Sequence, residues 1–174
     1  MCGINGLVYK NAENTDVQRI IEKMNQKIIH RGPDEDGFFV EHLEDKTIAF
    51  AMRRLSIVDL STGKQPIFTE DKSKIIVFNG QIYNSEELKK TLVQKGFVFH
   101  TSSPAEVGLK LYECFGLEAF KMLDGVFAFS IYDKILGKIF IARDFFGDKP
   151  LHYQHSEKGL IWASELKSVI SVLD

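Results

Sequence analysis

The chain has 174 residues, of which 44% are hydrophobic, and its formal net charge is −2. This length and composition fit one globular domain with a sizeable core. The nearly balanced charge gives no reason to expect a nucleic acid or an anionic membrane as a partner. No apolar run approaches the ~20 residues that a membrane-spanning helix needs. The amino-terminal segment lacks the apolar core of a signal peptide, so we predict a cytoplasmic protein.

The first predicted helix follows a polar segment near position 15. Thr15 and Gln18 form a capping-box pattern, in which two side chains bind free N–H groups at a helix start. Apolar residues then repeat at helical spacing: Val17, Ile20, Ile21, Met24 and Ile28. We expect this helix to end near His30, ahead of Gly32-Pro33, because proline cannot continue a helix.

Three more helices are expected further along the chain. One begins near Asn84 and ends at Gly96, a typical helix end. The next begins at Ser103-Pro104, with a serine cap and a proline at the first helical position, and Glu106 is expected to complete the cap. A short final helix is predicted from about Glu165 to Val172.

The strand-like segments indicate the fold class. The run 75–78 is apolar throughout, so we expect a strand that is buried on both faces and stops at the turn dipeptide Asn79-Gly80. The last four strands follow one another through short turns, which favours antiparallel pairing. We therefore predict an α+β fold with two packed sheets and helices outside them. The expected strands are 3–9, 37–40, 47–52, 75–78, 97–99, 126–132, 139–142, 151–154 and 160–163.

The chain holds two cysteines, Cys2 and Cys114, and five histidines that are spread along the sequence. Without an export signal, reduced thiols are expected. No group of histidines and cysteines has the spacing of metal ligands, so the sequence predicts no metal site. Cys114 lies on the same face of a predicted helix as Val107 and Leu111, which indicates a small core residue.

Cys2 has the most distinctive chemistry in the sequence. Removal of Met1 would leave a thiol and a free α-amine on one residue, and the ordinary pKa of such an amine is about 7.7–8.0. The amine is then partly neutral at pH 7 and can act as a base beside the sulfur, whose thiolate is the nucleophilic form. Because a peptide-bonded nitrogen cannot take a proton, we predict that activity requires the removal of Met1.

Short motifs accompany Cys2 along nearly the whole chain. They are Met1-Cys2-Gly3-Ile4, His30 to Asp34, Arg54 to Asp59, Asn79-Gly80 with Ile82-Tyr83-Asn84, Asp124-Gly125 before Phe127-Ala128-Phe129, Arg143-Asp144 with Gly147 and Lys149-Pro150, and Ala163-Ser164-Glu165 with Lys167. In this order and spacing the chain resembles the glutaminase domain of glutamine-dependent asparagine synthetases, a class II glutamine amidotransferase of the N-terminal-nucleophile hydrolase superfamily. The resemblance implies a four-layer αββα sandwich of two antiparallel sheets.

The resemblance also implies a role for each matching site residue. Cys2 would attack the side-chain amide of glutamine, with its own α-amine as base. The Asn79 side chain and the Gly80 backbone N–H would form the oxyanion hole, since a tetrahedral oxyanion needs two preorganised donors. Arg54 would hold the α-carboxylate of glutamine, because a guanidinium can bind a carboxylate through two bonds. The remaining residues expected to bind the substrate are Leu55, Ile57 and Val58, through the backbone, and Gln81.

Two departures from the family pattern concern the α-ammonium group of glutamine. The family usually has glutamate where this chain has Gln81. It usually has Gly-Ser-Asp where this chain has Ser102-Ser103-Pro104. In the family those two acidic residues bind the ammonium group, so we expect weaker glutamine binding here.

The resemblance implies that residues 1–174 form one domain that hydrolyses glutamine to glutamate and ammonia. It implies glutamine as the substrate and an ATP-dependent synthetase domain or subunit as the partner that uses the ammonia for asparagine synthesis. We expect that C-terminal synthetase domain to be absent from this chain. ATP and Mg²⁺ would belong to it, so no cofactor is expected for the glutaminase domain itself.

Two alternatives remain open from the sequence. The chain can keep the fold and serve as a regulatory or docking module with impaired glutamine binding, or it can be an amidotransferase with a different amide donor. The two lost acidic residues motivate the first alternative, whereas the presence of Cys2, Arg54, Asn79 and Gly80 argues against it. An ammonia assay with glutamine tests the first alternative, and a panel of amides tests the second.

Overall fold

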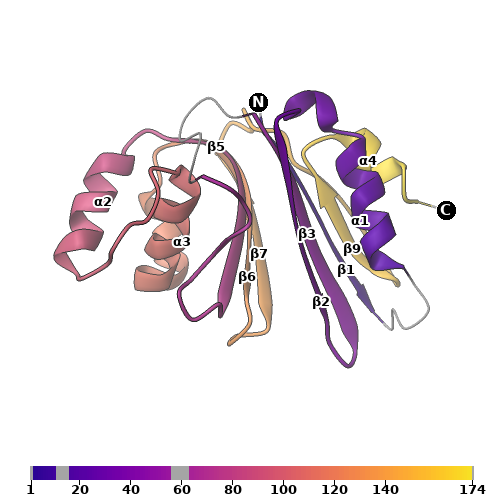
Figure 1. Ribbon diagram of the computed structural model, residues 1–174, viewed down its shortest axis with the longest axis horizontal. Coiled ribbons are helices and arrows are strands. Elements are labelled where there is room, and N and C mark those ends of the chain that lie inside the picture. Colours follow the sequence, from indigo (N-terminus) through magenta and orange to yellow (C-terminus); the bar gives the residue numbers. More distant parts are fainter. Residues whose placement is uncertain (1, 11–15, 56–62, 174) are drawn as a thin grey trace. The chain divides into compact units, whose positions relative to one another are not determined.

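The computed structural model describes residues 2–10, 16–55 and 63–173. The chain divides into two compact units. Unit 1 combines Met1–Leu55 with Pro150–Asp174, and unit 2 is Ser56–Lys149. Each unit contains one sheet with helices on one of its faces (Figure 1).

The sheet of unit 1 has the strand order β2-β3-β1-β9-β8, so β1 is its central strand. Its strand pairings are antiparallel. Two helices cover one face of this sheet (Figure 1). The elements are β1 (Gly3–Lys10), α1 (Val17–Gln26), the 3-10 helix η1 (Ile29–Arg31), β2 (Glu35–His42), β3 (Lys46–Arg54), β8 (His152–Ser156), β9 (Gly159–Ala163) and α4 (Leu166–Ile170).

The core of unit 1 lies between its helices and the central strands. Val17, Ile21 and Met24 recur at helical spacing on α1 and are fully buried. They pack against alternate residues of the strands, which point to one face of the sheet. The strand and helix residues of this cluster are Leu7, Tyr9, Ala49, Ala51, Ile161, Ala163 and Val169. This packing fixes α1 and α4 on the sheet whose central strand carries the start of the chain.

Two large rings meet over the central strand at Gly6. In the sheet register Gly6 lies between Phe50 of β3 and Trp162 of β9. The centroids of these two rings are 5.6 Å apart in an edge-to-face arrangement. A Cβ atom at position 6 would overlap the Trp162 ring, which is fully buried. Gly6 is therefore required for the two rings to meet.

The sheet of unit 2 has the strand order β4-β5-β6-β7, again with antiparallel pairings. Its helices lie on one face of the sheet (Figure 1). The elements are β4 (Ile67–Phe68), β5 (Lys74–Ile82), α2 (Ser85–Gln94), α3 (Pro104–Phe115), the 3-10 helix η2 (Gly116–Met122), β6 (Gly125–Asp133) and β7 (Lys138–Arg143).

Aromatic and aliphatic side chains of β5, β6, α2 and α3 form the core of unit 2. Phe78 of β5 and Phe129 of β6 stack with their centroids 6.1 Å apart. Tyr112 of α3 donates a hydrogen bond from its hydroxyl to Asp133 Oδ2 at 2.9 Å. Burial, followed by this bond to the Asp133 carboxylate, raises the pKa of Tyr112. Cys114 packs against the same core, as expected of a small core residue.

The predicted turn at Asn79-Gly80 is wrong, because β5 continues through both residues to Ile82. Gly80 has a φ of +141°. A Cβ atom at this position would overlap the carbonyl oxygen of Val126 in the neighbouring strand. Glycine at this position therefore allows the two paired strands to lie close together. The composition of Asn-Gly is typical of a hairpin turn, but the pairing with β6 overrides that local preference.

Two other local predictions are also wrong. Residues 97–99 form no strand, and the Phe97 N–H instead closes the end of α2. The first helix is capped by Asp16, whose carboxylate accepts a hydrogen bond from the Arg19 N–H at 3.0 Å. Thr15, the expected cap, lies outside the described residues. The structure also ends α1 at Gln26, earlier than expected, and places η1 after it.

The remaining predicted helices and strands are confirmed, with bounds that differ by no more than about two residues. The antiparallel sheets with helices confirm the predicted α+β class. Among the described residues, β4 and η2 are elements that the sequence patterns did not predict. Both elements are short, so neither has enough residues to show a hydrophobic repeat.

We predict that Gly6→Ala destabilises the protein, because the added methyl group displaces the Trp162 or Phe50 ring. Overpacking of this kind costs about 1–3 kcal/mol in the free energy of unfolding. Urea unfolding followed by circular dichroism measures the change. Gly108→Ala is the matched control, since its Cβ would lie 3.6 Å from Ile76 Cδ1, an ordinary contact. An unchanged unfolding midpoint for Gly6→Ala would contradict the role given to this glycine.

Candidate active site

Cys2 directly precedes the central strand of unit 1. Gly3 pairs with Arg53 of β3, so Cys2 lies beside the end of that strand. The Cys2 Sγ atom is 4.0 Å from the carbonyl oxygen of Leu55, and the residue is half-buried. The strand therefore holds the thiol in the body of the unit. It brings together Cys2 and Leu55, two of the residues that the sequence assigned to the site.

Arg54 ends β3 and is buried, with 5% of its surface exposed. Its Nη1 atom forms an ion pair with Glu35 Oε2 at 2.7 Å. The strand register pairs the same two residues across β2 and β3. Because Cys2 lies beside the end of β3, unit 1 brings the thiol and the guanidinium of Arg54 to the same end of its sheet. Glu35 fixes the direction of that guanidinium and was not identified from the sequence.

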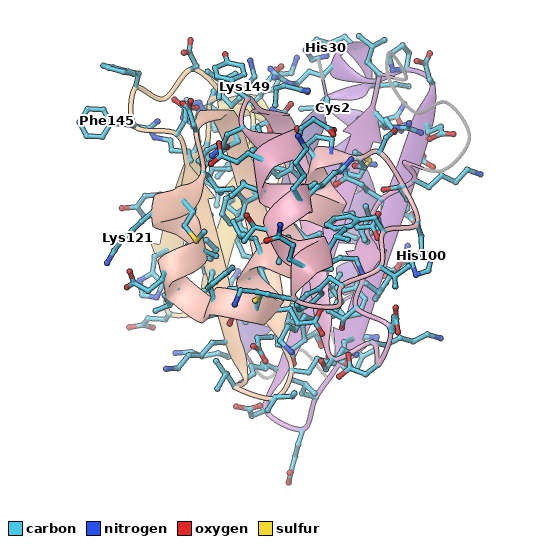
Figure 2. The ribbon with its side chains drawn as sticks, turned by 90° about the vertical axis from the view of Figure 1, so that its left-hand side faces the viewer. Cys2, His30, His100, Lys121, Phe145 and Lys149 are labelled. Carbon is cyan, nitrogen blue, oxygen red and sulfur yellow. The ribbon has the colours of Figure 1, made fainter. Side chains whose placement is uncertain are left out.

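A second arginine, Arg31 of η1, bonds to Cys2 itself. Its Nε donates to the Cys2 carbonyl oxygen at 2.9 Å, and its Nη1 pairs with Glu165 Oε1 at 3.1 Å. The Glu165 carboxylate also lies 2.8 Å from His30 Nε2 and 3.1 Å from Lys167 Nζ. Cys2 and His30 lie at the same end of unit 1 (Figure 2). Burial alone would raise the pKa of Glu165, but Lys167, His30 and Arg31 lower it to about 2.

The turn before α4 also holds the first strand. The Ser164 N–H donates to the Ile4 carbonyl at 2.8 Å, and the Ile4 N–H donates to Ser164 Oγ at 2.9 Å. Ser164 therefore fixes Ile4, while its neighbour Glu165 reaches Cys2 through Arg31. The sequence motif 163–165 indicated no role for these residues, because Ile4 and Ser164 are 160 positions apart in the chain.

Asn79, Gly80 and Gln81 follow one another in β5 of unit 2. Asn79 is buried, and its Nδ2 atom has no hydrogen-bond partner among the described residues. A buried donor without a partner costs about 1–3 kcal/mol of stability. A donor that is kept at this cost fits an oxyanion hole, in which N–H groups are fixed before the charge develops. Gln81 is exposed.

The start of α3 is organised by Ser103 and Glu106. Ser103 caps the helix, with its Oγ accepting from the Ala105 N–H at 3.2 Å, and Pro104 is the first helical residue, as predicted. Glu106 does not cap α3. Its buried carboxylate accepts hydrogen bonds from the backbone N–H groups of His100 at 2.9 Å and Thr101 at 2.7 Å. The prediction that Glu106 completes the helix cap is wrong, because two backbone N–H groups of the loop before the helix bind its carboxylate instead.

Glu106 also carries an ion pair that matters for the site. Lys110, one turn further along α3, places its Nζ 3.6 Å from Glu106 Oε1, and both side chains are buried. The negative charge of Glu106 is therefore taken up by Lys110 and by the loop backbone. It does not stand in for an acidic residue at Pro104.

Asp144 organises the loop that follows β7. Its carboxylate accepts backbone N–H bonds from Phe127, Asp148 and Lys149 at 3.2, 2.9 and 3.0 Å. Burial alone would raise the pKa of this carboxyl, but the backbone N–H groups hold it below its ordinary value. The loop backbone is thereby fixed, while the Phe145 side chain projects from it and is 95% exposed (Figure 2).

Two of the predicted pocket residues, Ile57 and Val58, lie outside the described residues, so their role stays a prediction. Within residues 2–10, 16–55 and 63–173, no three His, Cys, Asp or Glu side chains gather as metal ligands. In the same ranges, none of the helices has both the length and the apolar character to cross a membrane.

The comparison with known proteins identifies the chemistry of this chain. The family model described as the glutamine amidotransferase domain matches residues 1–174. The chain belongs to this family. It is therefore an amidotransferase enzyme domain, which confirms the resemblance found in the motifs.

The relatives of this amidotransferase domain are longer proteins. The domain is 44% identical over 172 residues to "Asparagine synthetase (glutamine-hydrolyzing) 1" of Bacillus subtilis, covering 98% of this chain and 27% of that protein. It is 40% identical over 171 residues to "Asparagine synthetase (glutamine-hydrolyzing) 2" of Oryza sativa subsp. japonica, covering 97% of this chain and 28% of that protein. The chain thus spans less than a third of the length of these two relatives.

Solved structures share the fold of the amidotransferase domain. The glutamine phosphoribosylpyrophosphate amidotransferase from B. subtilis, complexed with ADP and GMP, matches 97% of this chain and 43% of its own, with a TM-score of 0.75 and 22% identity. A structure described as the allosteric regulatory enzyme of purine biosynthesis matches with a TM-score of 0.77, the same identity and the same coverage. The likeness shows that the chain has the fold of these two proteins.

Proposed function

We propose that this domain hydrolyses glutamine to glutamate and ammonia, with Cys2 as the nucleophile. The observation that carries the proposal is the position of Cys2 at the start of the central strand. There Arg31 binds its carbonyl oxygen, and its thiol lies beside the end of β3, which Arg54 forms. The match of the whole chain to the amidotransferase family supports the same chemistry.

The proposed reaction begins when the α-amine of Cys2 takes the thiol proton. The thiolate then adds to the side-chain carbonyl carbon of glutamine. Asn79 Nδ2 and the Gly80 N–H stabilise the oxyanion, and the ammonium of Cys2 returns its proton to the leaving nitrogen. The C–N bond breaks, ammonia departs, and a thioester remains on Cys2. Water, deprotonated by the same amine, adds to the thioester and releases glutamate and the free thiol.

Substrate binding in this proposal rests on Arg54. Its guanidinium, held by Glu35, binds the α-carboxylate of glutamine. The backbone of Leu55, Ile57 and Val58 lines the pocket, and Gln81 meets the ammonium group as a neutral acceptor. Hydrolysis by these groups needs no cofactor.

The ammonia would serve a partner. The two longer relatives are named glutamine-hydrolyzing asparagine synthetases. We infer that this domain supplies ammonia to an ATP-dependent synthetase domain or subunit that forms asparagine, with ATP and Mg²⁺ bound there. A cytoplasmic location is part of the same proposal.

We predict that Cys2→Ala abolishes the release of ammonia from glutamine. The unfolding midpoint should stay unchanged, because alanine keeps the backbone bonds at the start of β1. The matched control is Cys114→Ala, which removes the other cysteine and should keep the parent rate. Mass spectrometry of the amino-terminal peptide should show that Met1 is absent from active protein. Ammonia release by Cys2→Ala at the parent rate would sink the proposal, and activity with Met1 attached would exclude the α-amine as base.

We predict that Asn79→Ala lowers kcat by about 10²–10³, the usual loss of one oxyanion donor. Its stability should fall less than that of Asn25→Ala, because Asn79 Nδ2 has no hydrogen-bond partner among the described residues. Asn25, by contrast, binds Asn5 and the Met52 carbonyl from a fully buried position. Steady-state kinetics and urea unfolding measure the two effects. A parent-like kcat in Asn79→Ala would show that Asn79 is not part of the oxyanion hole.

We predict that Gln81→Glu and Pro104→Asp together raise kcat/KM for glutamine. Hydrogen bonds to charged groups are worth about 1.5–3 kcal/mol, compared with roughly 1 kcal/mol for neutral pairs. A gain of ~1.4 kcal/mol in binding free energy corresponds to tenfold tighter binding. The kcat/KM of the double variant should therefore rise about tenfold or more. Glu113→Gln, an exposed change on α3, is the control. If the double variant shows no gain while the parent already has an ordinary KM, other residues recognise the ammonium group.

A further inference from the structure

We propose that Glu165 is a positioning residue for Cys2, and that it acts through Arg31. The kinetic part of this inference rests on the proposed function, whereas the structural part stands by itself. Arg31 is the link, because its guanidinium binds the Cys2 carbonyl oxygen through Nε and the Glu165 carboxylate through Nη1. The Arg31 side chain is 9% exposed and the Glu165 side chain 21%, so the guanidinium is largely shielded from bulk water.

Glu165 is itself held from several sides. Its Oε1 atom meets Arg31 and His30 at 3.1 and 2.8 Å, and its Oε2 atom meets Lys167 at 3.1 Å. Both carboxylate oxygens are therefore occupied, which fixes the plane of the carboxylate. The low pKa of Glu165 keeps it ionised at neutral pH, so Arg31 always faces a full negative charge.

The path of Arg31 depends on the absence of a side chain at Gly3. A Cβ atom there would lie 2.7 Å from Ile28 Cδ1 and 3.1 Å from Arg31 Cδ. The stem of Arg31 thus passes directly over the residue that follows Cys2. Glu165 helps to determine where this stem ends, because the guanidinium forms an ion pair with its carboxylate.

Holding the Cys2 carbonyl oxygen fixes both reacting groups of that residue. The thiol and the α-amine are attached to the same Cα, so rotation of the Cys2 backbone would move both of them. Ser164 fixes Ile4 with two hydrogen bonds, but β1 begins only at Gly3. The bond from Arg31 is therefore a restraint on the Cys2 backbone itself, and Glu165 directs it.

The kinetic experiment compares Glu165→Ala, Glu165→Gln and the control Glu157→Gln in the full chain. Glu157 is an exposed acid of the same unit, in the turn between β8 and β9. We expect kcat per folded molecule to fall about ten- to a hundredfold in Glu165→Ala, with KM for glutamine nearly unchanged, since a shift of ~1 Å can cost a hundredfold. Glu165→Gln keeps an acceptor for Arg31 without the charge and should lose less. The control should keep the parent kcat.

A double-mutant cycle tests whether Glu165 acts through Arg31. If it does, Glu165→Ala should change kcat by no more than about twofold when Arg31→Ala is already present, because the linked effects are not additive. If the loss of kcat in the double variant equals the product of the two single losses, the proposal is overturned.

Hydrogen exchange supplies a readout that does not need activity. In Glu165→Ala the peptide 2–10 should exchange about threefold faster or more, while peptides from α1 and β8 keep the parent rate, because opening is local. Parent-like exchange of 2–10 would overturn the proposal, and so would faster exchange throughout unit 1, which indicates a purely structural role. If the parent releases no ammonia from glutamine, the proposed function fails, and the exchange of 2–10 alone decides the positioning role.

Discussion

The pairing of β1 with a strand on each side is the constraint on which the candidate site depends. The first residues of a chain usually fray because few contacts hold them. Here Gly3 pairs with Arg53, and Asn5 pairs with Ala163. A nucleophile at position 2 thereby gains a fixed backbone from the residues that follow it. Gly3 and Gly6 contribute to this arrangement, because the absence of their side chains lets Arg31 and Trp162 lie across the strand.

The two units differ in whether the polar groups of their proposed site residues are already paired. In unit 1, Arg54 and Arg31 are already paired with carboxylates, so the start of the chain is fixed before a substrate arrives. In unit 2, Asn79 keeps a buried donor that has no partner among the described residues, which lowers stability and fits its proposed role in the oxyanion hole. The proposed roles account for this contrast, because a residue that only supports others can be paired in advance, whereas a group proposed to meet developing charge needs a free donor.

Local patterns predicted most helices and strands, because hydrophobic period is a property of neighbouring residues. They failed where a distant partner decides the conformation. Asn79-Gly80 has the composition of a turn, and only the pairing with β6 shows that it belongs to a strand. The motifs identified Cys2 and Arg54 as site candidates. The link from Arg31 to Glu165 spans 134 positions and depends on strand order, so no local pattern contains it.

The first turn of α3 is adapted to the helix and not to a cation. Ser103 caps it, and Pro104 suits a first helical position, where no N–H partner is needed. The start of a helix carries a partial positive charge, which disfavours an ammonium group unless an acidic side chain offsets it. Glu106 is the acidic residue of this turn, and its charge is already shared between Lys110 and backbone N–H groups. In the proposed function, recognition of glutamine therefore has to rely more on its carboxylate, at Arg54, than on its ammonium group.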